Sequence, residues 1–153
     1  LSIGLGMALA ARLQGRAFRS WVLLGDGELD EGQVWEAAMA AAKYRCANLT
    51  AIVDRNGYQQ TGPGDQVLPL EPLADKWAAC GWEVLSIDGH DWPAVLGALD
   101  RALADRRGPL AIIARTVKGY GVRRIVEDPG NKYHGVPLLG DAAEAAVREV
   151  LAG

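Results

Sequence analysis

The stretch WVLLGDGELDEGQVWEAAMAAAKYRCANLTAIVDRNGY, residues 21–58, decides the fold of this chain. It begins with a wholly apolar run over residues 21–24, and a second such run occupies residues 49–53. Between the two runs, residues 31–44 are rich in alanine and carry apolar side chains over more than one helical face. Short strands that are apolar throughout are buried on both faces, as in a parallel sheet covered by helices. The stretch therefore predicts a strand, a helix and a second strand parallel to the first.

The rest of the chain repeats this alternation of strand and helix. We expect further strands and helices at the following residues: strands at 82–87 and 110–114, helices at 3–14, 72–80 and 91–106, and a last helix from 141. Two irregular stretches, residues 58–69 and 118–140, separate some of these elements. Alternating strands and helices predict an α/β fold in which a parallel sheet carries helices on both faces. We expect residues 1–153 to form a single domain of this kind.

Local patterns refine the expected helix ends. Gly4 and Gly6 indicate close packing at the start of the first helix. Asp91 is expected to cap the helix that follows it, and Asp141 with Glu144 resembles a capping box at the start of the last helix. The tryptophan- and alanine-rich helix predicted for residues 31–44 either faces a partner chain or is buried in the chain's own core.

Composition and charge exclude several classes of protein. Half of the 153 residues are hydrophobic and 23% are charged, which suits a packed domain and not a disordered chain. The net charge of −3 does not fit a nucleic-acid-binding protein, whose binding face is strongly basic. Cys46 and Cys80 lie far apart without a CxxC pair. We therefore expect two buried thiols in a cytoplasmic protein, and no zinc site.

The apolar segment LSIGLGMALAARL, residues 1–13, is expected to be a core helix. It has neither the initiating methionine nor the basic residues of a signal peptide, and a membrane span needs about 18 apolar residues or more. We therefore expect no membrane association. Because the chain opens on apolar residues without a helix cap, we expect that an N-terminal segment of the domain is missing from it.

Polar residues follow the predicted strands at the points where the strands end. Gly25-Asp26-Gly27-Glu28 follows the first strand, and Asn56 comes thirty positions after Asp26, at the end of the second strand. Ligands of open α/β sheets bind beyond the carboxyl ends of the strands, so we expect these two side chains to lie close together. A carboxylate and an amide oxygen suit Mg²⁺, and the flanking glycines allow a diphosphate to approach the backbone. The alternative is that both segments are ordinary turns, but the spacing favours a site for a cation and a diphosphate.

These segments resemble the transketolase family of thiamine-diphosphate enzymes. Gly25-Asp26-Gly27 followed by Asn56 is similar to the family's thiamine-diphosphate motif. The sequence as a whole resembles transketolases in five segments that follow in the same order: GDGELDEGQVWEAAMAAAKY (25–44), NLTAIVDRNGYQQTG (48–62), LEPLADKWAACGWEV (70–84), IDGHDW (87–92) and ARTVKGYG (114–121). The likeness runs from Leu1 to about His134, and it implies the thiamine-diphosphate-binding fold.

The resemblance implies a role for each matching residue of the cofactor site. Asp26 and Asn56 would bind Mg²⁺ (or Ca²⁺) through their side chains, and the Tyr58 carbonyl would be a third ligand. Gly27 would lie against the diphosphate. The residues that the resemblance implies as cofactor-binding are Gly25, Asp26, Gly27, Glu28, Asn56, Tyr58, Lys118 and His134.

The resemblance implies catalytic roles for Glu31 and His134, and Lys118 and His90 are considered beside them. Glu31 matches a glutamate at the family's subunit interface near the two active sites; the alternative is a helix-start acid favoured by the helix dipole. His134 resembles the histidine of a Trp-His-Gly segment that faces cofactor and donor substrate, but here Tyr133 replaces the tryptophan and the spacing from Lys118 is longer. Lys118 matches a lysine near the diphosphate in some transketolases, and is otherwise a solvated loop cation. His90 is expected to be structural and to help set the start of the next helix.

The resemblance covers only the diphosphate-binding half of a transketolase. In the family another domain holds the cofactor's pyrimidine, and 153 residues leave no room for it. The sequence most resembles the amino-terminal subunit of split bacterial transketolases. This resemblance implies a complementary C-terminal subunit and an α2β2 assembly. A fragment of a longer chain is the alternative. The implied reaction transfers a two-carbon ketol unit from a ketose phosphate to an aldose, with sugars or sugar phosphates as substrates.

Two other functions stay open at this point. One is a subunit of another thiamine-diphosphate enzyme, such as a 1-deoxyxylulose-5-phosphate synthase or a 2-oxo acid dehydrogenase component. The segment Glu31-Gly32-Gln33 and the block LEPLADKW favour transketolase. The other is a non-catalytic relative kept as a scaffolding partner, against which the intact Asp26 and Asn56 argue.

Overall fold

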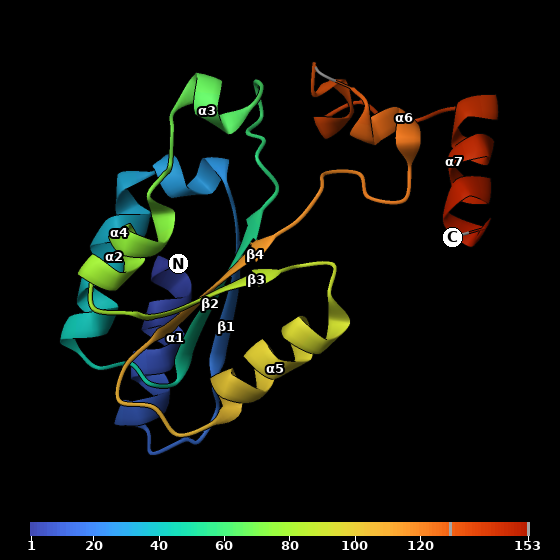
Figure 1. Cartoon of the computed structure of the whole chain (residues 1–153). Coiled ribbons are helices and arrows are strands. Elements are labelled where there is room, and N and C mark those ends of the chain that lie inside the picture. Colours follow the sequence, from blue (N-terminus) through green and yellow to red (C-terminus); the bar gives the residue numbers. More distant parts are fainter. Residues whose placement is uncertain (129, 153) are drawn as a thin grey trace.

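Four strands form one parallel sheet in the order β1-β2-β4-β3 (Figure 1). The computed structural model describes residues 1–128 and 130–152. Its strands are β1 (Ser20–Gly25), β2 (Leu49–Arg55), β3 (Glu83–Asp88) and β4 (Leu110–Arg115). All pairings between them are parallel. The predicted α/β class is confirmed, and each predicted strand is present within two residues of its expected bounds.

The strand register brings the carboxyl ends of three strands to one edge of the sheet. Gly25 of β1 lies opposite Asp54 of β2, and Asp54 lies opposite Ala114 of β4. The residues that directly follow these strands therefore meet at the same edge, which is where the sequence predicts the site.

Helices cover both faces of the sheet, as predicted (Figure 1). One face carries α1, α2 and α4, and the other carries α5. Their bounds are α1 (Ser2–Leu13), α2 (Gly32–Lys43), α4 (Leu73–Ala79) and α5 (Trp92–Leu103). A larger core cluster joins α1, α2 and α4 to the sheet, and a smaller one joins α5 to β4.

The helix predicted for residues 31–44 is buried in the chain's own core along one face. Val34 and Ala38 of α2 are fully buried, whereas Met39 is exposed. Trp77 of α4 packs between Trp35 of α2 and Trp82, with ring centroids 5.4 and 4.8 Å away. The tryptophan- and alanine-rich composition of this helix is thus explained by core packing.

The first helix lies so close to β1 that only glycine fits at one position. A Cβ atom built on Gly4 would lie 2.3 Å from Cγ2 of Val22, which is far inside van der Waals contact. Gly6 has no atom within 4 Å of such a Cβ, so the expectation of close packing is right for Gly4 and wrong for Gly6. Successive positions on a helix point about 100° apart, and residue 6 lies on the outer face.

The two stretches predicted as irregular contain short helices. Residues 58–69 include α3 (Gly64–Val67), and residues 118–140 include α6 (Arg123–Val126) and the 3-10 turn η2 (Lys132–His134). A further 3-10 turn, η1 (Gly27–Asp30), follows Asp26 directly. Elements of four residues or fewer are too short to show a helical period in sequence, so periodicity missed them.

Two predicted caps are not formed by side chains. Asp91 does occupy the cap position of α5, but its side chain makes no capping hydrogen bond. The last helix, α7 (Asp141–Ala152), begins at Asp141 itself, and its first turn is bonded to the carbonyl of Gly140. Asp141 is therefore inside the helix, where it acts on the helix dipole and not as a cap.

Two further expectations concern thiols and membranes. Cys46 is buried, but Cys80 is only half-buried, and both are free thiols. Within residues 1–128 and 130–152, the helices are all too short or too polar to cross a membrane.

Candidate functional site

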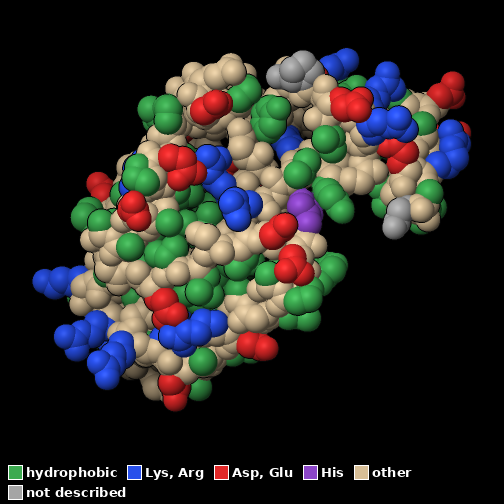
Figure 2. All heavy atoms as spheres, viewed as in Figure 1, with side chains coloured by type: hydrophobic (Ala, Val, Ile, Leu, Met, Phe, Trp, Pro, Cys, Tyr) green, Lys and Arg blue, Asp and Glu red, His purple; other side chains and the backbone are tan. Residues whose placement is uncertain are grey.

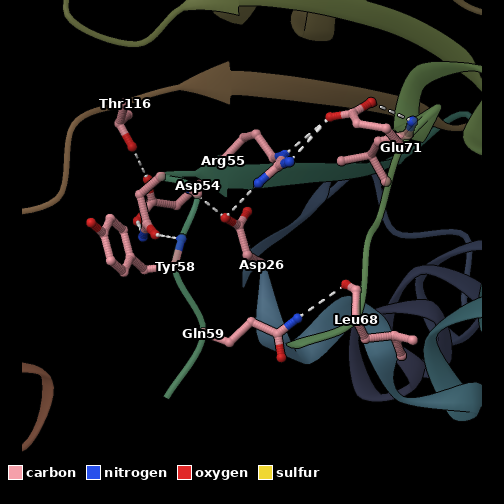
Figure 3. A network of polar contacts seen from close by, with 11 residues as sticks. Asp26, Asp54, Arg55, Tyr58, Gln59, Leu68, Glu71 and Thr116 are labelled. Atoms are coloured by element: carbon pink, nitrogen blue, oxygen red, sulfur yellow. Dashed lines mark hydrogen bonds and ion pairs between the residues drawn. The ribbon is translucent and has the colours of Figure 1, made fainter. Parts of the chain in front are cut away.

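Asp26 lies at the carboxyl end of β1 and is almost completely buried, with 1% of its surface exposed. Its Oδ2 accepts hydrogen bonds from the backbone N–H of Gly57 at 2.6 Å and from Nη1 of Arg55 at 2.9 Å (Figure 3). Its Oδ1 is buried and has no hydrogen-bond partner among the described residues. A buried carboxylate oxygen without a partner is costly, and it is the natural position for a cation ligand.

Burial raises the pKa of Asp26 above its ordinary value. The Arg55 guanidinium and the Gly57 N–H both lower this pKa, but the loss of water around the carboxylate outweighs them. The neighbouring Asp54 adds a further, smaller rise. The protein partners of the Asp26 carboxylate therefore do not fully replace the water that it loses on burial. A bound cation would favour its charged form.

Arg55 links the end of β2 to the start of α4. Its Nε and Nη2 lie 3.3 and 3.2 Å from Oε1 of Glu71, while Oε2 of Glu71 accepts from the N–H of Leu73 at 2.8 Å (Figure 3). Burial lowers the pKa of Arg55, but the carboxylates of Asp26 and Glu71 outweigh this and raise it. For Glu71, the Leu73 N–H is the main cause of a lowered pKa. The guanidinium is thus fixed between two carboxylates.

Asn56 follows Arg55 and is held by contacts on both sides of its amide. Its Oδ1 accepts from the N–H of Tyr58 at 2.9 Å, and its Nδ2 donates to Oδ2 of Asp54 at 3.0 Å. The other Asp54 oxygen accepts from the hydroxyl of Thr116, which follows β4 (Figure 3). An amide oxygen has two lone pairs, so Oδ1 of Asn56 keeps one acceptor position in addition to the Tyr58 bond.

Lys118, His134 and Tyr58 form a second group at the same edge of the sheet. Nζ of Lys118 lies 2.8 Å from Nδ1 of His134 and 5.9 Å from the centroid of the Tyr58 ring. Burial lowers the pKa of Lys118, although the Asp54 carboxylate opposes this. A lysine ammonium can only donate, so Nδ1 of His134 accepts and the imidazole proton sits on Nε2.

One cavity of about 750 Å³ joins these groups. All nine residues that the sequence singled out line it: Gly25, Asp26, Gly27, Glu28, Glu31, Asn56, Tyr58, Lys118 and His134. Glu31 is exposed and accepts a hydrogen bond from Nε2 of Gln33 at 3.1 Å. The volume lies within the range of about 300–1,000 Å³ that is usual for small-molecule sites.

Four residues of this network were not predicted from the sequence: Asp54, Arg55, Glu71 and Thr116. Asp54 and Arg55 sit directly before Asn56, and charged residues at the end of a buried strand were the available signal. Glu71 and Thr116 carried none, because their contacts depend on how distant segments dock.

His90 has a structural role, as expected, and this role is to join two loops. Its Nε2 accepts from the backbone N–H of Val117 at 2.9 Å, and its ring stacks on Tyr120 at 3.9 Å. The loop after β3 is thereby fastened to the loop after β4, which carries Lys118. A Cβ on Gly89 would lie 2.5 Å from Cγ2 of Thr116, so glycine is required for this close approach.

The donor set fits a hard cation with a phosphate ligand. The described residues hold no group of three or more His, Cys, Asp or Glu side chains that could coordinate a metal alone. One carboxylate, one amide oxygen and backbone carbonyls are instead what a Mg²⁺ ion takes when phosphate oxygens and water complete its octahedron. At Gly27 a Cβ would meet Cβ of Gln59 at 3.4 Å, so the bare backbone keeps this wall of the cavity open.

Comparison with known proteins identifies the family. Residues 16–152 match the family model described as transketolase, thiamine diphosphate binding domain. The chain belongs to the transketolase family. As a transketolase-family chain, it places the motif residues around one cavity at the carboxyl edge of a parallel sheet, where the sequence predicts them.

Named relatives include subunits of bacterial transketolases. The chain is 40% identical over 150 residues to an apulose-4-phosphate transketolase subunit of Phocaeicola vulgatus, covering 98% of this chain and 53% of the relative. It is 39% identical over 149 residues to a 6-deoxy-6-sulfo-D-fructose transketolase subunit of a Clostridium species, covering 97% of this chain and 54% of the relative. The chain thus spans about half the length of these curated relatives.

A solved structure shows the same fold. The crystal structure of Campylobacter jejuni transketolase matches with a TM-score of 0.85 at 28% identity, covering 96% of this chain and 24% of that one. The transketolase-family fold predicted from the sequence is confirmed.

Proposed function

We propose that this chain is the diphosphate-binding part of a thiamine-diphosphate-dependent transketolase subunit. The observation that carries the proposal is the buried Oδ1 of Asp26, which has no partner in residues 1–128 and 130–152 and lies at the wall of a cavity of about 750 Å³ lined by all nine motif residues. Family membership supports the cofactor, because the matching family model is the thiamine-diphosphate-binding domain. We take residues 1–153 as a single domain.

The residues around Asp26 would hold the cofactor through a divalent cation. Oδ1 of Asp26, Oδ1 of Asn56 and the carbonyl of Tyr58 are the proposed protein ligands of Mg²⁺ (or Ca²⁺). The bond from the Tyr58 N–H to Oδ1 of Asn56 holds the 56–58 turn in place before any ligand binds. Gly25, Gly27 and Glu28 line the same cavity and would lie beside the diphosphate.

The remaining residues of the cavity would balance the charge of the diphosphate, bind the sugar donor or face a partner chain. When bound, thiamine diphosphate supplies the reactive carbon that takes up the two-carbon unit. Lys118 would offset the negative charge of the diphosphate, as its partly buried ammonium faces the cavity. His134 presents Nε2–H as a donor because Lys118 occupies its Nδ1, which suits it to bind a hydroxyl of the sugar donor. Glu31 lies exposed at the cavity wall, where a partner chain could contact it.

A complementary C-terminal subunit would supply the pyrimidine-binding half. Two of the named relatives are themselves called transketolase subunits, which supports the presence of a partner chain. We infer an α2β2 assembly in which each site forms between unlike chains. Both cysteines are free thiols, which is usual in a reducing compartment, and we place the protein in the cytoplasm.

The proposed reaction transfers a two-carbon ketol unit from a ketose or ketose phosphate to an aldose. A direct test would use the full-length chain co-expressed with its complementary subunit. A ketose phosphate labelled with ¹³C at carbons 1 and 2 is mixed with an unlabelled aldose phosphate, and products are followed by NMR. We expect both labelled carbons to appear together in a sugar two carbons longer than the acceptor. The label should stay in the donor when Asp26→Ala replaces the wild type. Label scattered as single carbons, or transfer that survives Asp26→Ala, would contradict the proposal.

A further inference from the structure

Five arginines line a second cavity, at the end of the sheet opposite to Asp26. This cavity of about 350 Å³, which we call the arginine pocket, is lined by Arg12, Arg16, Arg19, Arg45 and Arg106 together with the carboxylate-bearing Asp105. Arg19 directly precedes β1, so the pocket lies at the amino ends of the strands. Figure 2 shows Lys and Arg side chains gathered at the lower left, where α1 and α2 end in the same view of Figure 1.

The arginine pocket is strongly positive on a chain that is acidic as a whole. Its five arginines and one aspartate give a formal charge of +4, whereas the whole chain carries −3. Four other arginines form ion pairs with glutamate or aspartate. In the part of the chain that the structure describes, the five pocket arginines form none. One aspartate does not balance five like charges, which repel one another, so this arrangement needs a reason.

Two of the five arginines are explained by helix ends. Arg12 donates from Nη1 to the carbonyl of Tyr44, which follows α2. Arg19 donates from Nη1 and Nη2 to the carbonyls of Ala102 and Leu103 at 3.1 and 2.8 Å, at the end of α5. Helix carboxyl ends carry partial negative charge and favour cations, so these two side chains have a structural role.

Arg106 is not explained in this way. It is half-buried, and its Nη2 donates to the carbonyl of Ala47 at 2.8 Å and to Oγ1 of Thr50 at 3.1 Å. Its Nε and Nη1 are buried without a partner among the described residues. Burial, followed by repulsion from Arg19, lowers the pKa of Arg106 to about 10. Arg106 therefore places a positive charge beside the pocket, and it forms no ion pair with the residues that the structure describes.

Arg16 and Arg45 provide the exposed donors. Both side chains are exposed, and neither makes a hydrogen bond or an ion pair among the described residues. Arg45 also has a left-handed backbone, with φ of 49°, a conformation in which glycine or asparagine would cost less. A guanidinium matches the oxygens of a phosphate group with two parallel N–H donors.

We propose that the arginine pocket binds a phosphate-type dianion, with Arg16 and Arg45 donating to its oxygens and Arg106 supplying uncompensated charge behind them. Free phosphate and a phosphomonoester share this chemistry. The site is separate from the cavity at Asp26, because the two lie at opposite ends of the strands.

The test measures the melting temperature of the full-length protein against sodium phosphate, with sodium chloride at matched ionic strength as the reference. Arg16→Gln/Arg45→Gln removes the exposed donors and leaves the hydrogen bonds of Arg106 intact. Lys43→Gln/Arg107→Gln is the control, because it removes the same charge from exposed neighbours that do not line the pocket. Both variants keep the Asp26 cavity, so phosphate binding there cancels in the comparison.

We expect phosphate to raise the melting temperature of the wild type and of the control in a saturable manner. The midpoint concentration should rise about tenfold or more in Arg16→Gln/Arg45→Gln. Repeating the titration with glycerol 3-phosphate distinguishes the sources: a lower midpoint than for phosphate identifies a phosphomonoester ligand, and an equal midpoint identifies the phosphate group itself. No saturable effect beyond chloride, or an equal loss in both double variants, would overturn the proposal.

Discussion

Nη1 of Arg55 lies 2.9 Å from Oδ2 of Asp26, and the two residues come from the ends of neighbouring strands. The ion pair occupies one carboxylate oxygen, and the other has no partner in the part of the chain that the structure describes. Glu71 binds the same guanidinium, so Arg55 is oriented before any ligand arrives. The site is therefore preorganised, which reduces the ordering that a cation and a diphosphate would require.

Replacing Arg55 should destabilise the chain more than replacing its outer partner. Arg55→Met leaves the Asp26 carboxylate buried without a counter-charge, and we expect the free energy of unfolding to fall by about 3 kcal/mol. Glu71→Gln breaks an ion pair whose carboxylate side chain is 65% exposed, and a loss of about 1 kcal/mol or less is expected. Urea unfolding of both variants measures the difference. A larger loss for Glu71→Gln would show that Asp26 does not depend on Arg55.

The raised pKa of Asp26 predicts a pH dependence of stability. The folded state binds the Asp26 proton more tightly than the unfolded chain, whose value is near 3.8. The charged carboxylate therefore costs stability, and this cost is absent below the unfolded pKa and complete above the folded one. The free energy of unfolding of the wild type, minus that of Asp26→Asn, should fall as the pH rises from 3.8 through the folded pKa. A rise over that interval, in urea titrations at successive pH values, would mean that the Arg55 pair dominates.

Two glycines of α1 should respond oppositely to the same substitution. Gly4→Ala places a methyl group 2.3 Å from Cγ2 of Val22, and we expect a loss of about 1–3 kcal/mol from overpacking. Gly6→Ala meets no atom within 4 Å and should raise the free energy of unfolding by about 0.5–1 kcal/mol through helix propensity. Equal effects of the two substitutions in urea unfolding would show that α1 does not lie this close to β1.

Gly27 should matter for ligand affinity more than for folding. In Gly27→Ala the new methyl group meets Cβ of Gln59 at 3.4 Å, a contact that small shifts relieve, but it stands in the wall of the cavity. We expect thiamine diphosphate to bind about tenfold more weakly, with the melting temperature nearly unchanged. Gly32→Ala, with no atom within 4 Å of the added group, is the matched control and should bind as the wild type does.

The fold was predictable because its main signals are local. Residues 21–24 and 49–53 are apolar without alternation, which separates buried parallel strands from helices in this chain. The same pattern predicts that Asp26 and Asn56 lie at neighbouring strand ends, and the register of β1 and β2 agrees with this prediction. The short helices α3 and α6 could not be predicted, because four residues are too few to show the helical repeat of apolar side chains.

The rest of the site depended on contacts between distant segments. Arg55 meets Glu71 only because the segment before α4 docks against the end of β2, and His90 meets Val117 only because two loops pack together. The number of residues between the two partners does not predict either contact. The arginine pocket could not be predicted for the same reason, because its five arginines are spread over the sequence from residue 12 to residue 106.

The most direct test of the central claim is isothermal titration of thiamine diphosphate with Mg²⁺ into the full-length chain together with its complementary subunit. We expect saturable binding that requires Mg²⁺, disappears in Asp26→Ala and persists in Asp75→Ala, which removes an exposed acid of α4 outside the cavity. Binding that survives Asp26→Ala, or that proceeds equally well without a divalent cation, would contradict it.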